Sequence, residues 1–184
     1  RGGANRGQGI KGVLDSKLGD DRGTDLAGVS NLAPVPRSLD ENPAVPETSP
    51  KQRAAYAGAQ PGKLNFGSCG VGTAAHLAGE LFNTTSGARM MHIAYKGGSL
   101  AMNDLLGGQI QVMFANLPEA ISHVKAGKLR ALAVTGEQRH PQQPDVPTFA
   151  ESGYKEINLK SWFGLLAPQN TPKPLVDKLS NDRA

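Results

Sequence analysis

The sequence has little of several features that define common functional classes, and each shortage narrows the possibilities. A single cysteine occurs in 184 residues, so an internal disulfide is excluded. The histidines show no metal-ligand spacing. They are His76, His92, His123 and His140. We therefore expect no metal and no other cofactor.

Charge and hydropathy argue against two kinds of partner. The chain has 20 basic and 16 acidic residues without a basic run, which gives nucleic-acid binding no support. No apolar run is long enough to span a membrane. The chain opens on Arg1 rather than Met and begins without a recognisable signal peptide, so we expect a fragment or an internal segment.

The most informative segment is a glycine-rich turn. Residues 67–76 read Gly-Ser-Cys-Gly-Val-Gly-Thr-Ala-Ala-His, after an apolar run and before an expected helix. This arrangement gathers backbone N–H groups, the hydroxyls of Ser68 and Thr73, and the positive end of a helix. It predicts a binding site for a small carboxylate or phosphate. On the glycines alone, a strand-to-helix connection without a ligand is an equal alternative.

Two side chains of this segment have open roles. Cys69 stands where a thiolate could be stabilised as a nucleophile, but no base is evident, and a small residue filling a tight loop is the simpler interpretation. His76 either points at the site or is a polar residue of the core.

Strands and helices alternate from residue 63 onward. The expected strands are 64–66, 91–95, 110–114, 129–135 and 159–167, and the expected helices are 51–59, 73–84, 100–106, 116–127 and one that begins at 171. Such alternation predicts βαβ units and a parallel sheet. Right-handed crossovers then bring the loops 67–73, 96–99 and 115–118 to one edge, where α/β sheets bind ligands.

Finer details of two helices follow from periodicity and capping. In the helix 73–84, Thr73 is the expected N-cap. Its apolar face is expected to carry Ala74, Leu77, Ala78 and Leu81. Ser99 is the expected N-cap of the next helix.

Nucleotide-binding motifs fit poorly. The glycines of the turn fall in the wrong order for a dinucleotide fingerprint, and the second strand ends in Tyr95-Lys96 rather than in an acidic residue. A P-loop requires a lysine after its last glycine, and Thr73 follows here.

Several runs, in the same order along the chain, resemble one protein family. They are Pro61–Ser68, the glycine turn through His76, Leu77–Phe82, Tyr95–Gly97, Asp104–Gln109, Met113-Phe114, Ala126–Thr135, Asp145–Thr148 and Trp162–Pro168. The family is the Bug family of periplasmic solute-binding receptors, which serve tripartite tricarboxylate transporters. The match is dense from about residue 54 to residue 181.

The resemblance implies a periplasmic-binding-protein-like α/β fold, a Venus flytrap whose two lobes close on a small carboxylate. In that family, backbone amides, hydroxyls and waters hold the carboxylate. The positions that match the carboxylate-binding turn are Ser68, Gly70, Gly72 and Thr73, and those of the neighbouring loop are Tyr95, Lys96 and Gly97. His76 and Asn116 complete the nine expected substrate-binding residues.

The resemblance also sets the expected domains. Residues 1–61 would be the remnant of an incomplete first lobe, with a poorly ordered N-terminal part. Residues 62–137 would be a complete second lobe with a parallel sheet, and residues 138–184 a return segment and the start of a C-terminal helix packing on the first lobe. Asp40-Glu41 stand where the family has an apolar pair in a strand that links the lobes.

We therefore interpret the chain as a truncated extracytoplasmic receptor for a carboxylate solute. We expect it to be periplasmic, monomeric and without enzymatic activity. Its partners would be the solute and the membrane subunits of a transporter. Two alternatives stay open. One is a small α/β enzyme that uses the glycine turn as a phosphate or oxyanion site, and the other is a receptor fragment without function.

Overall fold

The computed structural model describes residues 26–45 and 49–181, which form parts of two compact units. One unit is Pro36–Ser161, and the described parts of the other are 26–35 and 162–181. The unit Pro36–Ser161 therefore extends beyond the expected lobe 62–137 at both ends. The expected disorder of residues 1–24 concerns a segment outside the described residues.

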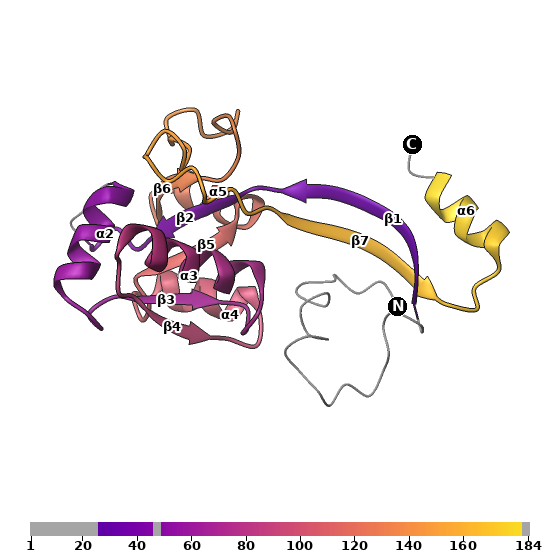
Figure 1. Cartoon of the computed structure of the whole chain (residues 1–184), viewed down its shortest axis with the longest axis horizontal. Coiled ribbons are helices and arrows are strands. Elements are labelled where there is room, and N and C mark those ends of the chain that lie inside the picture. Colours follow the sequence, from indigo (N-terminus) through magenta and orange to yellow (C-terminus); the bar gives the residue numbers. More distant parts are fainter. Residues whose placement is uncertain (1–25, 46–48, 182–184) are drawn as a thin grey trace. The chain divides into compact units, whose positions relative to one another are not determined.

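Strands and helices follow one another nearly as the sequence indicates (Figure 1). Their bounds are β1 Leu26–Val35, β2 Arg37–Glu41, α2 Pro50–Ala59, β3 Asn65–Ser68, α3 Ala74–Ser86, β4 Met91–Ala94, α4 Gly98–Leu106, β5 Val112–Asn116, α5 Leu117–Lys125, β6 Arg130–Val134, β7 Ser161–Pro168 and α6 Lys173–Asn181.

The sheet of the larger unit is mixed, so the expectation of a purely parallel sheet is wrong. Its strand order is β4-β3-β5-β2-β6. Strand β3 pairs in parallel with both β4 and β5, as the alternation predicts. Strand β2 lies antiparallel between β5 and β6, which separates two strands that would otherwise be neighbours.

Strand β2 is buried along its whole length although its sequence is polar. Glu41 is fully buried and accepts hydrogen bonds from two arginines, from Arg53 Nε at 2.9 Å and from Arg130 at 3.1 Å. A buried carboxylate requires such partners, because the interior solvates charge poorly. The arginines therefore explain how Glu41 stands where an apolar residue was expected.

Helices cover both faces of this sheet. α2 and α3 pack on one face in a core that includes Leu39, Phe66, Phe82 and Phe114. α4 and α5 pack on the other face around Met113 and smaller residues. The right-handed crossovers of the parallel strands place the ends of β3, β4 and β5 at one edge.

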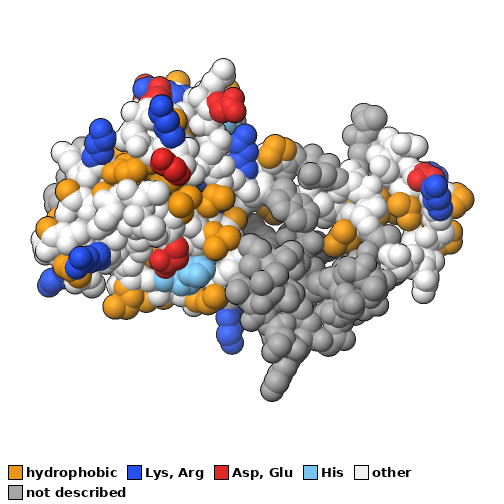
Figure 2. Space-filling model, viewed as in Figure 1, with side chains coloured by type: hydrophobic (Ala, Val, Ile, Leu, Met, Phe, Trp, Pro, Cys, Tyr) orange, Lys and Arg blue, Asp and Glu red, His pale blue; other side chains and the backbone are white. Residues whose placement is uncertain are grey.

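Thr73 is the N-cap of α3, which confirms the expected start of this helix. The expected apolar face is wrong by about one position. The buried residues are Ala75, Ala78, Gly79 and Phe82. Leu77 is 39% exposed, and Figure 2 shows hydrophobic side chains at several places on the visible face of this unit.

The expected cap of α4 is also wrong. Its N-cap is Gly97, without a side-chain hydrogen bond, and Ser99 lies inside the first turn. The smaller unit contains a two-stranded sheet of β1 and β7, and α6 packs against β1.

Asp40 makes the stability of the larger unit depend on pH. It is fully buried; its Oδ2 accepts a hydrogen bond from Ser38 at 2.6 Å, and its Oδ1 has no partner among the described residues. Burial raises the pKa of Asp40 to about 7, against the lowering effect of the Ser38 hydrogen bond, and nearby Glu41 raises it slightly further. Because the pKa in the folded state exceeds the unfolded value, the stabilisation is complete below about pH 4 and is lost as the pH rises through 7.

We expect Asp40→Asn to flatten this part of the pH profile. Urea unfolding from pH 4 to pH 8 should show a free energy of unfolding that falls less steeply in the variant, by at most about 1.4 kcal/mol for each unit of pKa difference removed. The exposed Asp145→Asn serves as the control and should keep the slope of the parent. Equal slopes in the parent and Asp40→Asn would contradict this interpretation.

Gly79 provides a test of packing between α3 and the sheet. A Cβ at this position would lie 2.1 Å from Cε2 of the buried Phe66 ring. Gly79→Ala should therefore lower the free energy of unfolding by about 1–3 kcal/mol through overpacking, although alanine normally stabilises a helix by about 1 kcal/mol relative to glycine. Glu80→Ala, at an exposed position beside it, is the control; a stabilised Gly79→Ala would refute the packing described here.

Candidate functional site: the glycine turn between β3 and α3

The turn after β3 lies directly beside the loop after β4. Tyr95 N donates to Ser68 O at 2.9 Å, which continues the parallel pairing of the two strands beyond their ends. Gly70 and Gly72 have φ values of +128° and +74°, which side chains other than that of glycine rarely adopt. The predicted meeting of the two loops at one sheet edge is thereby confirmed.

Both hydroxyls of the turn are used within it. Ser68 Oγ is buried, accepts from Gly70 N at 3.2 Å and lies 3.0 Å from Gly70 O. Thr73 Oγ1 donates to Gly70 O at 2.7 Å and accepts from His76 N at 3.4 Å. These side chains therefore fix the shape of the turn and the start of α3.

Other backbone donors of the turn stay available. Among the described residues, no acceptor takes the N–H groups of Val71 and Ala74. Val71 is 64% exposed, and Ala74 is the first residue of α3. The first N–H groups of a helix lack partners inside it and carry its positive partial charge, so they favour an anion.

Two histidines contact the turn from α3 and β4. His76 Nδ1 accepts from Gly72 N at 3.1 Å, so this side chain contacts the turn. His92 Nε2 lies 2.6 Å from Ser68 Oγ. The two imidazole rings stack with centroids 4.0 Å apart, and His92 also stacks on Phe66.

His92 was not predicted as a residue of this site. It lies two positions before Ala94, which pairs with Ser68 in the parallel ladder, and the ladder brings it over Phe66. Partial burial lowers the pKa of His92; the neighbouring His76 adds to this and Glu80 opposes it. The one usable signal would have been the alternation of polar and apolar residues along β4.

The remaining expected residues lie near the same edge, but their side chains have other contacts. The Tyr95 hydroxyl donates to Asp104 Oδ2 at 2.7 Å, and burial together with this acceptor raises the pKa of Tyr95 to about 12. Lys96 is exposed and Gly97 caps α4.

Asn116 is buried at the end of β5. Its Nδ2 donates to Glu119 Oε1 at 3.0 Å, and its Oδ1 accepts from the hydroxyl of Ser161 at 3.0 Å. No described contact joins Asn116 to the glycine turn. Of the nine expected residues, the structure thus connects Ser68, Gly70, Gly72, Thr73 and His76 directly, and Tyr95 through its backbone.

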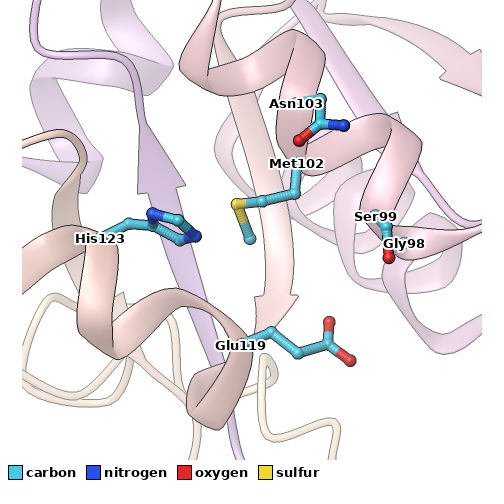
Figure 3. Close-up of a pocket in the computed structure, with 6 residues that line it drawn as sticks. All are labelled: Gly98, Ser99, Met102, Asn103, Glu119 and His123. Atoms are coloured by element: carbon cyan, nitrogen blue, oxygen red, sulfur yellow. The ribbon is translucent and has the colours of Figure 1, made fainter.

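A separate cavity of about 310 Å³ lies between α4 and α5 (Figure 3). Its lining residues are Gly98, Ser99, Met102, Asn103, Glu119 and His123. None of them is among the expected site residues, although Gly98 follows Gly97 and Glu119 contacts Asn116. Within 26–45 and 49–181, no group of three or more potential metal ligands occurs, and no helix there is long and apolar enough to cross a membrane.

Known proteins resemble the chain over most of its length. The family model "Tripartite tricarboxylate transporter family receptor" matches residues 13–183. Protein BugT of Bordetella pertussis is 40% identical over 153 residues, which are 83% of this chain and 47% of BugT. The chain thus spans about half the length of the curated relatives it matches.

Solved structures show the same fold. An R. palustris protein solved with adipate has a TM-score of 0.88 at 34% identity, over 92% of this chain and 56% of that one. The periplasmic binding protein BugD has a TM-score of 0.80 at 36% identity, over 84% of this chain and 52% of that one. The chain therefore belongs to the receptor family of the tripartite tricarboxylate transporters and has the α/β fold of periplasmic binding proteins.

Proposed function

We propose that this chain binds a small carboxylate at the glycine turn 67–73, as part of an extracytoplasmic solute receptor for a tripartite tricarboxylate-type transporter. The proposal rests on two N–H groups without an acceptor among the described residues, those of Val71 and Ala74. They lie in the turn that leads into the N-terminus of α3, where the helix has its positive partial charge. A carboxylate oxygen accepts hydrogen bonds from such groups without any side-chain cation.

The hydroxyls and the histidines support this assignment indirectly. Ser68, Thr73 and His76 hold the backbone of the turn, so its free N–H groups are pre-oriented before a ligand arrives. Pre-orientation lowers the ordering cost of binding. Lys96, exposed in the neighbouring loop, adds a positive charge near the same edge.

The matching solved structures guide the choice of ligand and of cellular location. One of the matching structures was solved with adipate, and another is a periplasmic binding protein. We infer a di- or tricarboxylate solute, a periplasmic location and action as a monomer with the membrane subunits of the transporter. The specific solute depends on parts of a receptor other than this turn.

Binding without turnover is favoured over catalysis. The pair Ser68 Oγ and His92 Nε2, 2.6 Å apart, is what an enzyme would require of a nucleophile and base. Ser68 is fully buried, however, and its hydroxyl already bonds within the turn. A substrate could not reach this oxygen without dismantling the site.

The 184-residue chain alone should bind weakly. A flytrap receptor encloses its ligand between two lobes, whereas the turn offers one face, and hydrogen bonds exposed to water contribute much less than the roughly 1.5–3 kcal/mol of desolvated ones. We expect dissociation constants on the order of millimolar, or about 4 kcal/mol. Calorimetry against di- and tricarboxylates, amino acids and aromatic acids is the measurement.

The double variant Ser68→Ala, Thr73→Ala should abolish this binding, because Gly70 then loses the hydroxyls that bond its N–H and its carbonyl. Ser122→Ala on the exposed side of α5 is the control and should bind as the parent does. A submicromolar ligand would show that the chain makes a complete site. Undiminished binding by the folded double variant would place the site elsewhere.

A further inference from the structure

Two stacked imidazole rings, those of His76 and His92, contact the glycine turn. His76 belongs to the first turn of α3 and His92 to β4, and each contacts a different part of the turn. His76 contacts Gly72, and His92 contacts Ser68. The ring centroids are 4.0 Å apart with 26° between the planes, so the two rings lie against each other.

The contact to Gly72 fixes the protonation of His76. Gly72 N donates to Nδ1 at 3.1 Å, so Nδ1 carries no proton and the neutral ring has its proton on Nε2. That nitrogen lies 3.7 Å from Glu80 Oε1. A second proton on the ring would have to go on Nδ1, where it would face the N–H of Gly72.

His92 can keep its contact in either state. Ser68 Oγ either donates to His92 Nε2 or accepts from it, because the hydroxyl has a second acceptor in Gly70 O at 3.0 Å. Two charged rings at 4.0 Å would repel, however, so a proton on one ring disfavours a proton on the other.

The charges around the pair are few. Among the described residues, Glu80 on α3 is the one carboxylate that acts on the rings. From β3 the pair meets Phe66 and Ser68, and from the turn it meets Gly72, all uncharged. Glu80 is about half exposed, and it opposes the lowering of the pKa of His92.

We propose that the stacked His76–His92 pair positions the carboxylate-binding turn, and that a neutral His76 is required for the turn to keep its binding shape. The proposal rests on the proposed function of the turn. It predicts that acidification weakens carboxylate binding, because the protonated Nδ1 repels the N–H of Gly72 and the turn rearranges. Simple charge attraction predicts the opposite, since a cationic imidazole beside the turn would attract an anion.

The test is a pH titration of the ¹⁵N-labelled 184-residue chain by NMR, with adipate as the probe. The amide signal of Gly72 in the free chain should shift together with the protonation of His76. The affinity for adipate should fall by about tenfold per pH unit, at most, below the midpoint of that shift. A Gly72 amide that does not follow His76, or adipate bound equally or more tightly at pH 5.5 than at pH 7.5, overturns the proposal.

Matched variants separate positioning from mere packing. In His76→Asn, the amide oxygen replaces Nδ1 as an acceptor that does not titrate, so binding at pH 7.5 should persist and its pH dependence should disappear. His76→Leu lacks any acceptor and should lose the affinity at every pH. His140→Asn is the control, because His140 Nδ1 also accepts a backbone N–H, that of Gln142, in another loop; it should retain the pH profile of the parent.

The same data test the proposed carboxylate binding and the proposed role of His76 separately. If adipate and the other carboxylates do not bind at pH 7.5, the proposed function is wrong, and the Gly72 shift in the free chain still decides whether His76 controls the shape of the turn. Should His76→Asn fail to fold, His92→Gln, which retains a donor and acceptor near Nε2, provides a second test. This variant should retain the change in the Gly72 amide signal on protonation of His76. Loss of that change in His92→Gln would contradict the positioning role of His76.

Discussion

The sheet of the larger unit depends on the antiparallel insertion of β2 between β5 and β6. β6 pairs with the rest of the sheet through β2, and the chain enters this unit at Pro36, directly before β2. Because the strand is buried along its length, its polar residues require internal partners: Glu41 bonds Arg53 and Arg130, and Arg37 donates to Ser161 Oγ at 2.7 Å. These contacts connect the strand to α2, β6 and the start of β7. The parallel strands β3, β4 and β5 then share one edge, where the glycine turn lies.

At that edge, the side chains and the backbone have different roles. The side chains of Ser68, Thr73, His76 and His92 all bond the turn itself. The N–H groups of Val71 and the start of α3 are left for an anion. In the proposed site, a carboxylate would therefore be recognised by groups that cannot be mutated directly, and the side chains would influence binding by controlling where those groups point. A pair of imidazoles in this supporting role would transmit pH to the backbone.

Local signals were sufficient to predict much of this architecture. Alternating apolar runs gave the order of strands and helices from residue 63, and Thr73 was identified as a cap because a hydroxyl before an apolar periodic segment is a local feature. The turn and its neighbouring loop were placed together by the handedness of crossovers. Non-local pairing was not predictable in the same way. The segment Arg37–Glu41 lacks an apolar alternation, and its partners follow some seventy residues or more later in the chain.

The errors within the site have similar physical causes. His92 reaches Ser68 through the register of β3 and β4, which no single segment encodes. The buried face of α3 was displaced because Gly79 counts as no apolar residue in a periodic pattern, yet its missing side chain admits the ring of Phe66. The central claim is that the turn after β3 binds the carboxylate. Its most direct test is a map of backbone amide shifts of the 184-residue chain on titration with adipate. The account predicts the largest changes at Val71, Ala74 and their neighbours in the turn; changes centred instead on Ser99 and His123 of the cavity between α4 and α5, or no changes at all, would contradict it.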